Sequence, residues 1–261
     1  MSHMPISIKD INDKLVQAGR LEYRPIYVYG TDETPKGAYQ VSSVLKNGHP
    51  CLAKALLKMA IYSDVPPLYI GKDALESCCF GAASSMGFTP FPPMMRDLMS
   101  AESKSGGSMY LKSSDAVSDR TIENLGRITP PGKYVVMAPA AFINEKAHEV
   151  LSVLCFGNSE QIRNLCGLIH FSRTDPFSSI IAPWGPHCAV FIAYPSGMAE
   201  KAPKNTAFLG PTEPDGNDWF PPELLSLSMP MGMARRISQD YDASFAGKKP
   251  EVAYPAIREK L

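Results

Sequence analysis

Residues 149–171 read EVLSVLCFGNSEQIRNLCGLIHF, and this stretch decides the fold class. Its first part, Glu149–Phe156, is rich in apolar and β-branched residues and predicts a strand. The apolar residues of Asn158–Phe171 recur at helical spacing, so this part predicts an amphipathic helix that Asn158 or Ser159 can cap. A strand that passes directly into a helix indicates a core built from both elements.

Working outward, the same reasoning places strands and helices along the whole chain. Strands are predicted at Arg24–Gly30, Leu68–Gly71, Met109–Lys112, Lys133–Pro139, Ser178–Pro183, Cys188–Tyr194 and Leu224–Ser228. Helices are predicted at Ile8–Leu21, Cys51–Ile61, Ser118–Gly126 and Met233–Phe245. Ser77–Phe88 predicts a tight turn that enters a helix of small residues. Pro90–Met99 predicts irregular structure or an excursion, and Ser103–Ser108 a mobile loop.

Strands and helices alternate without regular spacing, which favours an α+β fold with a mixed sheet and packed helices. No glycine-rich phosphate-binding motif follows a strand. We predict an N-terminal helix in residues 1–22 (the first residues resemble a tag), one domain in 23–245 and a C-terminal tail in 246–261. Residues 50–90 and 158–195 share the order helix, Asp-Pro break, strand and cysteine-bearing turn. Two duplicated α/β halves packed as one domain are therefore the alternative, with both cysteine turns in one central cleft.

Composition excludes several classes of protein. Hydrophobic residues make up 44% and charged residues 20%, which is typical of a globular chain. Lysine plus arginine and aspartate plus glutamate are both 26, so the formal charge is zero and neither nucleic acid nor membrane is expected as a partner. No export signal is visible, and the six cysteines contain no C-x-x-C spacing. We expect a cytoplasmic protein with free thiols that binds a small molecule, with a homo-oligomer left open.

Four motifs carry a resemblance to a known family: LYIGKDALESCCFGAASSMG at 68–87, the strand and helix at 149–171, APWGPHCA at 182–189, and SLSMPMGMARR at 226–236. In their order and spacing, over roughly residues 20–245, they resemble the family called domain of unknown function 169, or ArCR. That resemblance implies an occurrence mainly in anaerobic bacteria and archaea, and it brings no established activity.

The resemblance also points to residues. A family cysteine followed by glycine and alanine is matched by Cys79 with Gly81 and Ala82, and a second cysteine turn is matched by His187-Cys188. Many members have a third cysteine near the C-terminus, where this chain has Met229. A three-cysteine metal or cluster site in relatives would therefore be a Cys/Cys/Met site here.

The two cysteine turns are the sharpest candidate site. At the first turn of a helix, backbone N–H groups would lower the pKa of the Cys79 thiol, which could then attack an electrophile, bind a metal together with Cys188, or pair with Cys188. His187 could act as a base or a ligand. Packing of all these side chains as core residues is the structural alternative.

Four further residues are candidates for contact with a cofactor of unknown identity. Gly81 and Ala82 would allow a ligand to approach the backbone closely, and Trp184 could form a wall for a planar group. Arg235 could bind a carboxylate or phosphate group. These residues favour a small-molecule or metal/cofactor-binding redox accessory protein. A thiol-dependent enzyme with Cys79 as nucleophile and His187 as base, and a binding scaffold without chemistry, are the alternatives.

Overall fold

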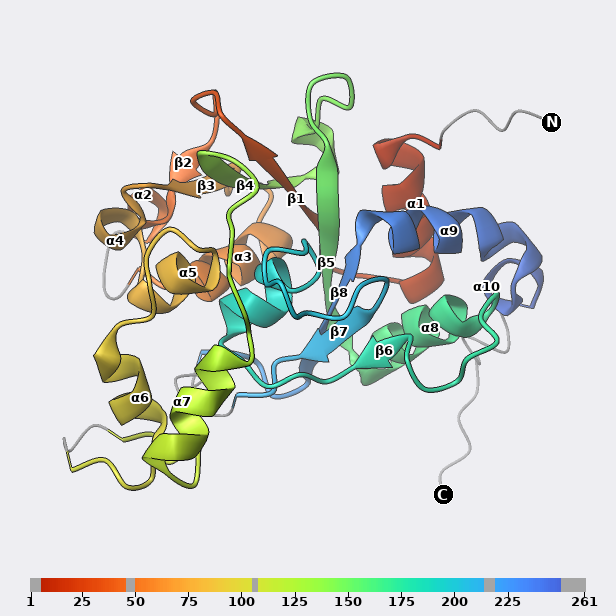
Figure 1. Ribbon diagram of the computed structural model, residues 1–261. Helices are drawn as coiled ribbons and strands as arrows, with labels where there is room; N and C mark the ends of the chain where they lie inside the picture. Colours follow the sequence, from red (N-terminus) through yellow and green to blue (C-terminus); the bar gives the residue numbers. More distant parts are fainter. Residues whose placement is uncertain (1–5, 46–49, 105–107, 214–218, 250–261) are drawn as a thin grey trace.

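The computed structural model describes residues 6–45, 50–104, 108–213 and 219–249, which contain one eight-stranded mixed sheet with helices on both faces (Figure 1). The strands are β1 Ile26–Thr31, β2 Tyr39–Gln40, β3 Leu68–Gly71, β4 Tyr134–Pro139, β5 Val150–Asn158, β6 Ile180–Ile181, β7 Ala207–Gly210 and β8 Leu224–Pro230. The α-helices are α1 Ile8–Gly19, α2 Val41–Val44, α3 Leu52–Ile61, α4 Ala74–Ser77, α5 Phe80–Ser85, α6 Pro93–Met99, α7 Asp115–Glu123, α8 Ser159–His170, α9 Met231–Asp240 and α10 Phe245–Lys248. A π-helix, η2, spans Ala189–Ala193, and short 3-10 helices span Ala140–Phe142 (η1) and Tyr241–Ala243 (η3). This architecture confirms the predicted α+β fold.

The strand order is β2-β3-β4-β1-β5-β8-β7-β6. Read inward from each edge, the second, third and fourth strands of a set of four follow one another, and the first strand of the set lies at the centre. At each edge two strands are parallel, β2 with β3 and β6 with β7, and every other neighbouring pair is antiparallel. Strands β1–β4 form one half of the sheet and β5–β8 the other, and the two halves meet where β1 pairs with β5. The predicted duplication of residues 50–90 and 158–195 stays a prediction, and helices α3 and α8 of those segments pack on opposite faces.

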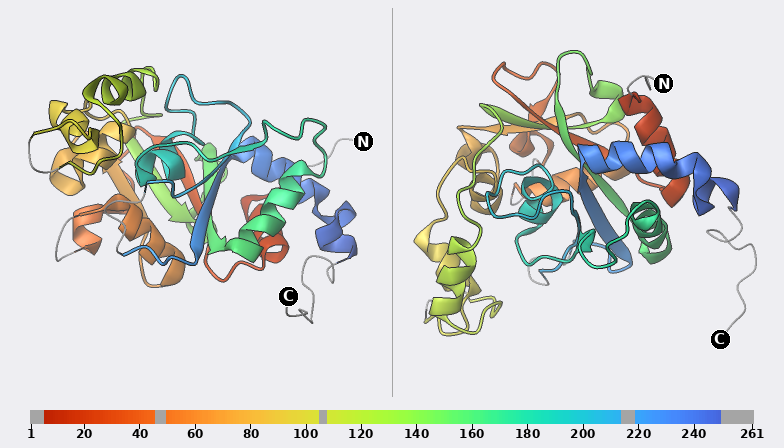
Figure 2. Two further views of the ribbon diagram at one scale, coloured as in Figure 1. Left: turned by 90° about the horizontal axis from the view of Figure 1, so that it is seen from below. Right: turned by 45° about the vertical axis from the view of Figure 1, so that its right-hand side comes forward.

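Alternating side chains of the central strands divide the core into two layers. Ile26 and Val28 of β1 pack into a front layer with α3, α5 and η2, whereas Tyr27 packs into a back layer with α1, α8 and α9. Figure 2 shows α1, α8 and α9 side by side and separated from α3 and α5. Because each layer is apolar, the sheet is buried on both faces.

Helix α8 begins as its sequence predicts. The Asn158 side chain accepts a hydrogen bond from the Gln161 backbone N–H at 3.0 Å, and the Gln161 side chain accepts one from the Asn158 N–H at 2.9 Å. This reciprocal pair is a capping box, which satisfies two backbone donors that a helix start leaves without partners. The junction between β5 and α8 is thereby fixed without an intervening loop.

Three predicted elements were wrong. Cys188–Tyr194 is not a strand but enters the π-helix η2, whose residues are all buried, and an apolar run that is buried all round carries no periodicity to distinguish the two. Pro90–Met99 is not irregular, because Pro93 occupies the first position of α6, where proline is tolerated. Met109–Lys112 forms only an isolated bridge, between Lys112 and Ser100.

Two further predictions concern segments that lie partly outside the described residues. The loop predicted at Ser103–Ser108 includes residues 105–107, and the predicted tail includes 250–261, all of which lie outside the described part. Residues 246–248 of that tail belong to α10. In the described part of the chain, every helix is too short or too polar to cross a lipid bilayer.

Candidate functional site

A cavity of about 390 Å³ lies in the front layer where three helices begin. The polar wall of this cysteine cavity consists of three thiols, an imidazole and a carboxylate, from Cys51, Cys79, Cys188, His187 and Glu213. Its apolar wall is formed by Met95, Leu98, Met99, Met109, Leu111 and Trp219, and the Trp219 ring packs against that of His187. Gly81 and Ala82 also line the cavity, so the structure brings five of the predicted site residues together.

Each of the three thiols in the cavity belongs to the residue that caps a helix. Cys51 is the N-cap of α3, Cys79 that of α5 and Cys188 that of η2. The Cys79 backbone N–H donates to the Pro50 carbonyl at 3.1 Å, which holds the start of α5 against the start of α3. Helices α5 and η2 are themselves in contact. Three helix starts therefore converge on one cavity and bring the thiols with them.

The vicinal cysteines point to different environments. Cys78 is buried, does not line the cavity, and donates its S–H to the Ala74 carbonyl at 3.1 Å. Burial raises the pKa of the Cys78 thiol from 9.0 to about 12. Cys79 is half-buried and faces the cavity. The pair thus consists of one packing thiol and one cavity thiol.

Cys79 and Cys188 are hydrogen-bonded to each other across the two halves of the sheet. This bond, together with burial, raises the pKa of the Cys188 thiol well above its ordinary value of 9.0. Cys188 is 4% exposed. It is therefore the member of the pair that keeps its proton, and Cys79 is the more accessible sulfur. Burial also raises the pKa of the Cys51 thiol.

The imidazole of His187 is held by its neighbours but leaves one nitrogen without a partner. His187 is 7% exposed, and its Nδ1 lies 3.7 Å from Oε2 of Glu213. Its ring packs edge-on against Phe191 and is tilted against Trp219. Its Nε2 is buried and has no hydrogen-bond partner among the described residues. A neutral imidazole with its proton on Nδ1, the nitrogen nearer Glu213, would present Nε2 as a hydrogen-bond acceptor.

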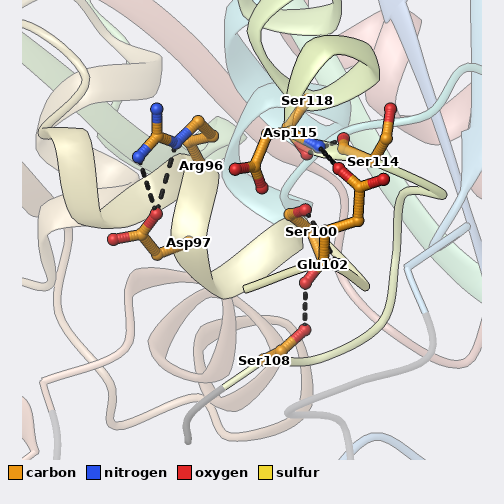
Figure 3. Close-up of polar contacts among 8 residues, drawn as sticks. All are labelled: Arg96, Asp97, Ser100, Glu102, Ser108, Ser114, Asp115 and Ser118. Carbon is orange, nitrogen blue, oxygen red and sulfur yellow. Dashed lines mark hydrogen bonds and ion pairs between the residues drawn. The ribbon is translucent and has the colours of Figure 1, made fainter. Parts of the chain in front are cut away.

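Apart from Trp219, the apolar wall comes from the segment that contains α6 and the residues before α7, which Figures 1 and 2 show apart from the centre of the sheet. Backbone bonds join its two arms: the Met109 N–H donates to Leu98 O at 2.7 Å and the Lys112 N–H to Met99 O at 2.8 Å. Figure 3 shows the polar contacts of the segment, including the Ser108 hydroxyl on the Ser100 carbonyl. The two arms are therefore tied together, and the methionine and leucine side chains of both line the cavity.

Gly81 leaves space inside the cavity. A Cβ atom added at this helical glycine would meet no atom within 4 Å. By contrast, a Cβ at Gly30 in β1 would lie 2.7 Å from the Pro131 carbonyl oxygen. Close packing of α5 against the sheet therefore does not account for Gly81, although the packing of Ala82 and Ala83 into the front core does fit that explanation.

Two predicted cofactor-binding residues do not reach this cavity. Trp184 lines a separate cavity of about 140 Å³, where the Lys112 ammonium lies 3.9 Å from the centre of its ring. Arg235 lies on α9 in the back layer and donates to the Ile6 carbonyl at 3.1 Å. The fold thus places Trp184 and Arg235 away from Cys79 and Cys188, and a role of either in cofactor binding stays a prediction.

The third sulfur is also a different residue from the one that the resemblance implies. Met229 on β8 is fully buried in the back layer, on the opposite face from the thiols. Cys51 takes the third place instead. Among the residues described, no three or more His, Cys, Asp or Glu side chains are arranged to hold one metal ion. Metal binding by Cys79 and Cys188 stays a prediction.

Sequence reasoning missed Cys51, Glu213 and Trp219. Cys51 had a detectable signal, since it directly precedes an amphipathic helix and occupies its N-cap. Glu213 and Trp219 lie outside regular elements, on either side of residues 214–218, which are not described. No periodic pattern could have identified them.

The comparisons with known proteins give a family and no activity. A family model for domain of unknown function 169, described as uncharacterised ArCR, matches residues 14–240. Neither the curated proteins nor the solved structures contain a match to this chain. The matched residues include both cysteine turns and all eight strands. The chain therefore belongs to the uncharacterised ArCR family, domain of unknown function 169.

Proposed function

We propose that the chain binds a small, largely apolar molecule in the cysteine cavity. The observation that carries this proposal is the pairing of an apolar wall with a wall of thiols and an imidazole around a cavity of about 390 Å³. Pockets for small ligands are typically about 300–1,000 Å³, mostly apolar, with a few polar groups that set orientation. The cavity matches that pattern in size and in chemistry.

The buried Nε2 of His187 supports a ligand with a hydrogen-bond donor. Leaving a buried nitrogen without a hydrogen bond costs about 1–3 kcal/mol. A bound molecule that donates a hydrogen bond to Nε2 would remove that cost and so bind more tightly. Met95, Met99 and Met109 support an apolar body, because methionine side chains adapt to irregular shapes. The ligand class is thus an apolar molecule, and an N–H or O–H group on it would gain a hydrogen bond to Nε2.

The thiols suit a reducing compartment, since cytoplasmic reductants maintain cysteines in the thiol form. A cytoplasmic location is therefore part of the proposal. The alternative of Cys79 as nucleophile and His187 as base has one requirement, a contact between the thiol and the imidazole. Nε2 of His187 makes no hydrogen bond to any described group, so that alternative has less support than binding.

The test uses N-phenyl-1-naphthylamine, a dye with an apolar body and one N–H donor that becomes fluorescent in apolar surroundings. The blocking variant is Gly81→Leu, whose side chain would enter the cavity. Gly232→Leu is the matched control, because Gly232 is also the second residue of a helix and a Cβ there also meets no atom within 4 Å. Gly232 is exposed on α9 and does not line the cavity.

We expect the wild-type chain and Gly232→Leu to bind the dye equally, with a saturable signal. Gly81→Leu should weaken binding by about tenfold or more, on the order of 1.4 kcal/mol. Equal binding by all three chains, or no binding by the wild type, would contradict the proposal. Near-ultraviolet circular dichroism checks that both variants keep the fold.

A further inference from the structure

The hydrogen bond between Cys79 and Cys188 joins two thiols that are far apart in sequence and come from different halves of the sheet. Both line the cysteine cavity, and the helices that they cap, α5 and η2, are in contact. A disulfide has its two sulfurs about 2.05 Å apart, so these neighbouring thiols must move together to form one. The geometry thus provides a dithiol on the wall of a cavity.

The two thiols differ in a way that suits successive roles. Cys79 is half-buried and lines the cavity, so an incoming molecule can reach its sulfur. Cys188 is buried behind it and keeps its proton, because the bond to Cys79 and burial both raise its pKa. The rate of thiol–disulfide exchange depends on access to the attacking sulfur, so Cys79 would attack first and Cys188 would resolve the mixed disulfide.

We propose that Cys79 and Cys188 are a redox-active dithiol that reduces a small apolar disulfide admitted to the cysteine cavity. This inference rests on the proposed function, since the disulfide must enter the same cavity. It adds a chemical class of substrate, a reaction and a division of roles between the two cysteines.

The reaction has two exchange steps. The Cys79 sulfur, after loss of its proton, attacks one sulfur of the bound disulfide; a bond forms between them, the substrate S–S bond breaks, and the leaving thiolate takes up a proton. Cys188 then loses its proton and attacks the Cys79 sulfur, which releases the second thiolate to be protonated in turn. The dithiol is oxidised by two electrons to a Cys79–Cys188 disulfide, and the substrate is reduced to two thiols.

His187 is placed to assist the second step. It directly precedes Cys188 and lines the same cavity, and its Nε2 has no partner among the described residues. Glu213, at 3.7 Å from Nδ1, would stabilise the imidazolium that forms when Nε2 takes the proton. Because Nε2 makes no hydrogen bond to a thiol before the reaction, it can accept the proton of Cys188 only after the sulfurs have moved together, and it serves neither thiol as a base in the starting structure.

The test treats the fully reduced full-length chain, without oxygen, with one equivalent of 2,2′-dithiodipyridine. This probe is an apolar aromatic disulfide whose released thiopyridone is measured by its absorbance. For the wild type we expect two thiopyridones per chain, no retained pyridylthio group, and a peptide map that links Cys79 to Cys188. Gly81→Leu should slow this reaction by about tenfold, in parallel with its loss of dye binding.

Variants assign the order of the steps. Cys188→Ser should release one thiopyridone and retain a pyridylthio group on Cys79, and Cys79→Ser should form no link. Cys166→Ser is the matched control, because Cys166 is also a half-buried thiol but packs against the back layer. It should behave as the wild type. The wild-type peptide map keeps the test valid if a cavity variant fails to fold.

The outcomes separate this inference from the proposed function. A wild-type chain that binds the dye but forms no Cys79–Cys188 link, or that links Cys79 to Cys51 instead, overturns the redox inference and leaves ligand binding standing. A chain that binds no dye yet forms the Cys79–Cys188 link contradicts the binding proposal and leaves the dithiol standing.

Discussion

Cys155 offers a test of the division between packing thiols and cavity thiols. It lies on β5 with no exposed surface, in the back layer, and burial raises the pKa of its thiol from 9.0 to about 12. The folded chain therefore holds this proton where the unfolded chain loses it. The free energy of unfolding should be unaffected below pH 9 and should fall as the pH rises from 9 toward 12.

The magnitude follows from the size of the shift. Each pKa unit corresponds to about 1.4 kcal/mol, so a shift of roughly three units contributes about 4 kcal/mol, of which about 2 kcal/mol is lost between pH 9 and 11. Cys155→Ala removes the titrating group at a cost on the order of 1 kcal/mol from lost packing. The variant should thus be less stable than the wild type at pH 8 and more stable at pH 11.

The assay is urea unfolding at several pH values from 8 to 11, with a non-thiol reductant present throughout. Val153→Ala is the control, because Val153 is fully buried in the same layer and carries no titrating group. Its difference from the wild type should not vary with pH. A constant difference between the wild type and Cys155→Ala over this range would refute the assignment of Cys155 as a buried, protonated thiol.

Two further substitutions test the packing that positions the site. Ser228→Ala removes the hydroxyl that donates to the Val190 carbonyl of η2 at 2.6 Å, and it should lower the free energy of unfolding by about 1–2 kcal/mol. Gly30→Ala would place a Cβ 2.7 Å from the backbone oxygen of Pro131, so the chain must shift at a cost of about 1–3 kcal/mol. Urea unfolding at neutral pH measures both.

Each of these changes has a matched partner. Ser226 is also fully buried on β8, but its hydroxyl has no partner among the described residues, so Ser226→Ala should be neutral or stabilising. Gly232→Ala should stabilise α9 by up to about 1 kcal/mol, because nothing obstructs its Cβ. If the two serine variants, or the two glycine variants, changed the free energy of unfolding by the same amount, the contact named for Ser228 or for Gly30 would not be the cause.

Amphipathic elements were predictable because their burial is one-sided. Leu68–Gly71 was predicted with the bounds that the structure has, and the helix after Asn158 begins with a capping signal that the sequence displays directly. Burial on all sides removes that signal. The apolar run after Cys188 was read as a strand for this reason, and only its position between α5 and the sheet makes it a π-helix.

The candidate site could be predicted where it depended on the two turns, since Cys79, Gly81, Ala82, His187 and Cys188 all line one cavity. It could not be completed because the remaining wall comes from segments whose arrangement is tertiary. α6 was taken as irregular structure on account of its prolines, yet it supplies two methionines of the apolar wall. Trp184 was chosen for its proximity in sequence, whereas the cavity uses Trp219.

The pairing of β1 with β5 has a consequence for how the two thiols are kept in position. Cys79 belongs to the half that ends in β1 and Cys188 to the half that begins with β5, so the distance between their sulfurs depends on the register of these strands. Ile26 lies opposite Leu154, and the register shifts between Val28 and Tyr29. The hydrogen bonds between β1 and β5 thus fix the position of one half of the sheet relative to the other. The relative position of the Cys79 and Cys188 thiols therefore depends in part on strand pairing at the middle of the sheet.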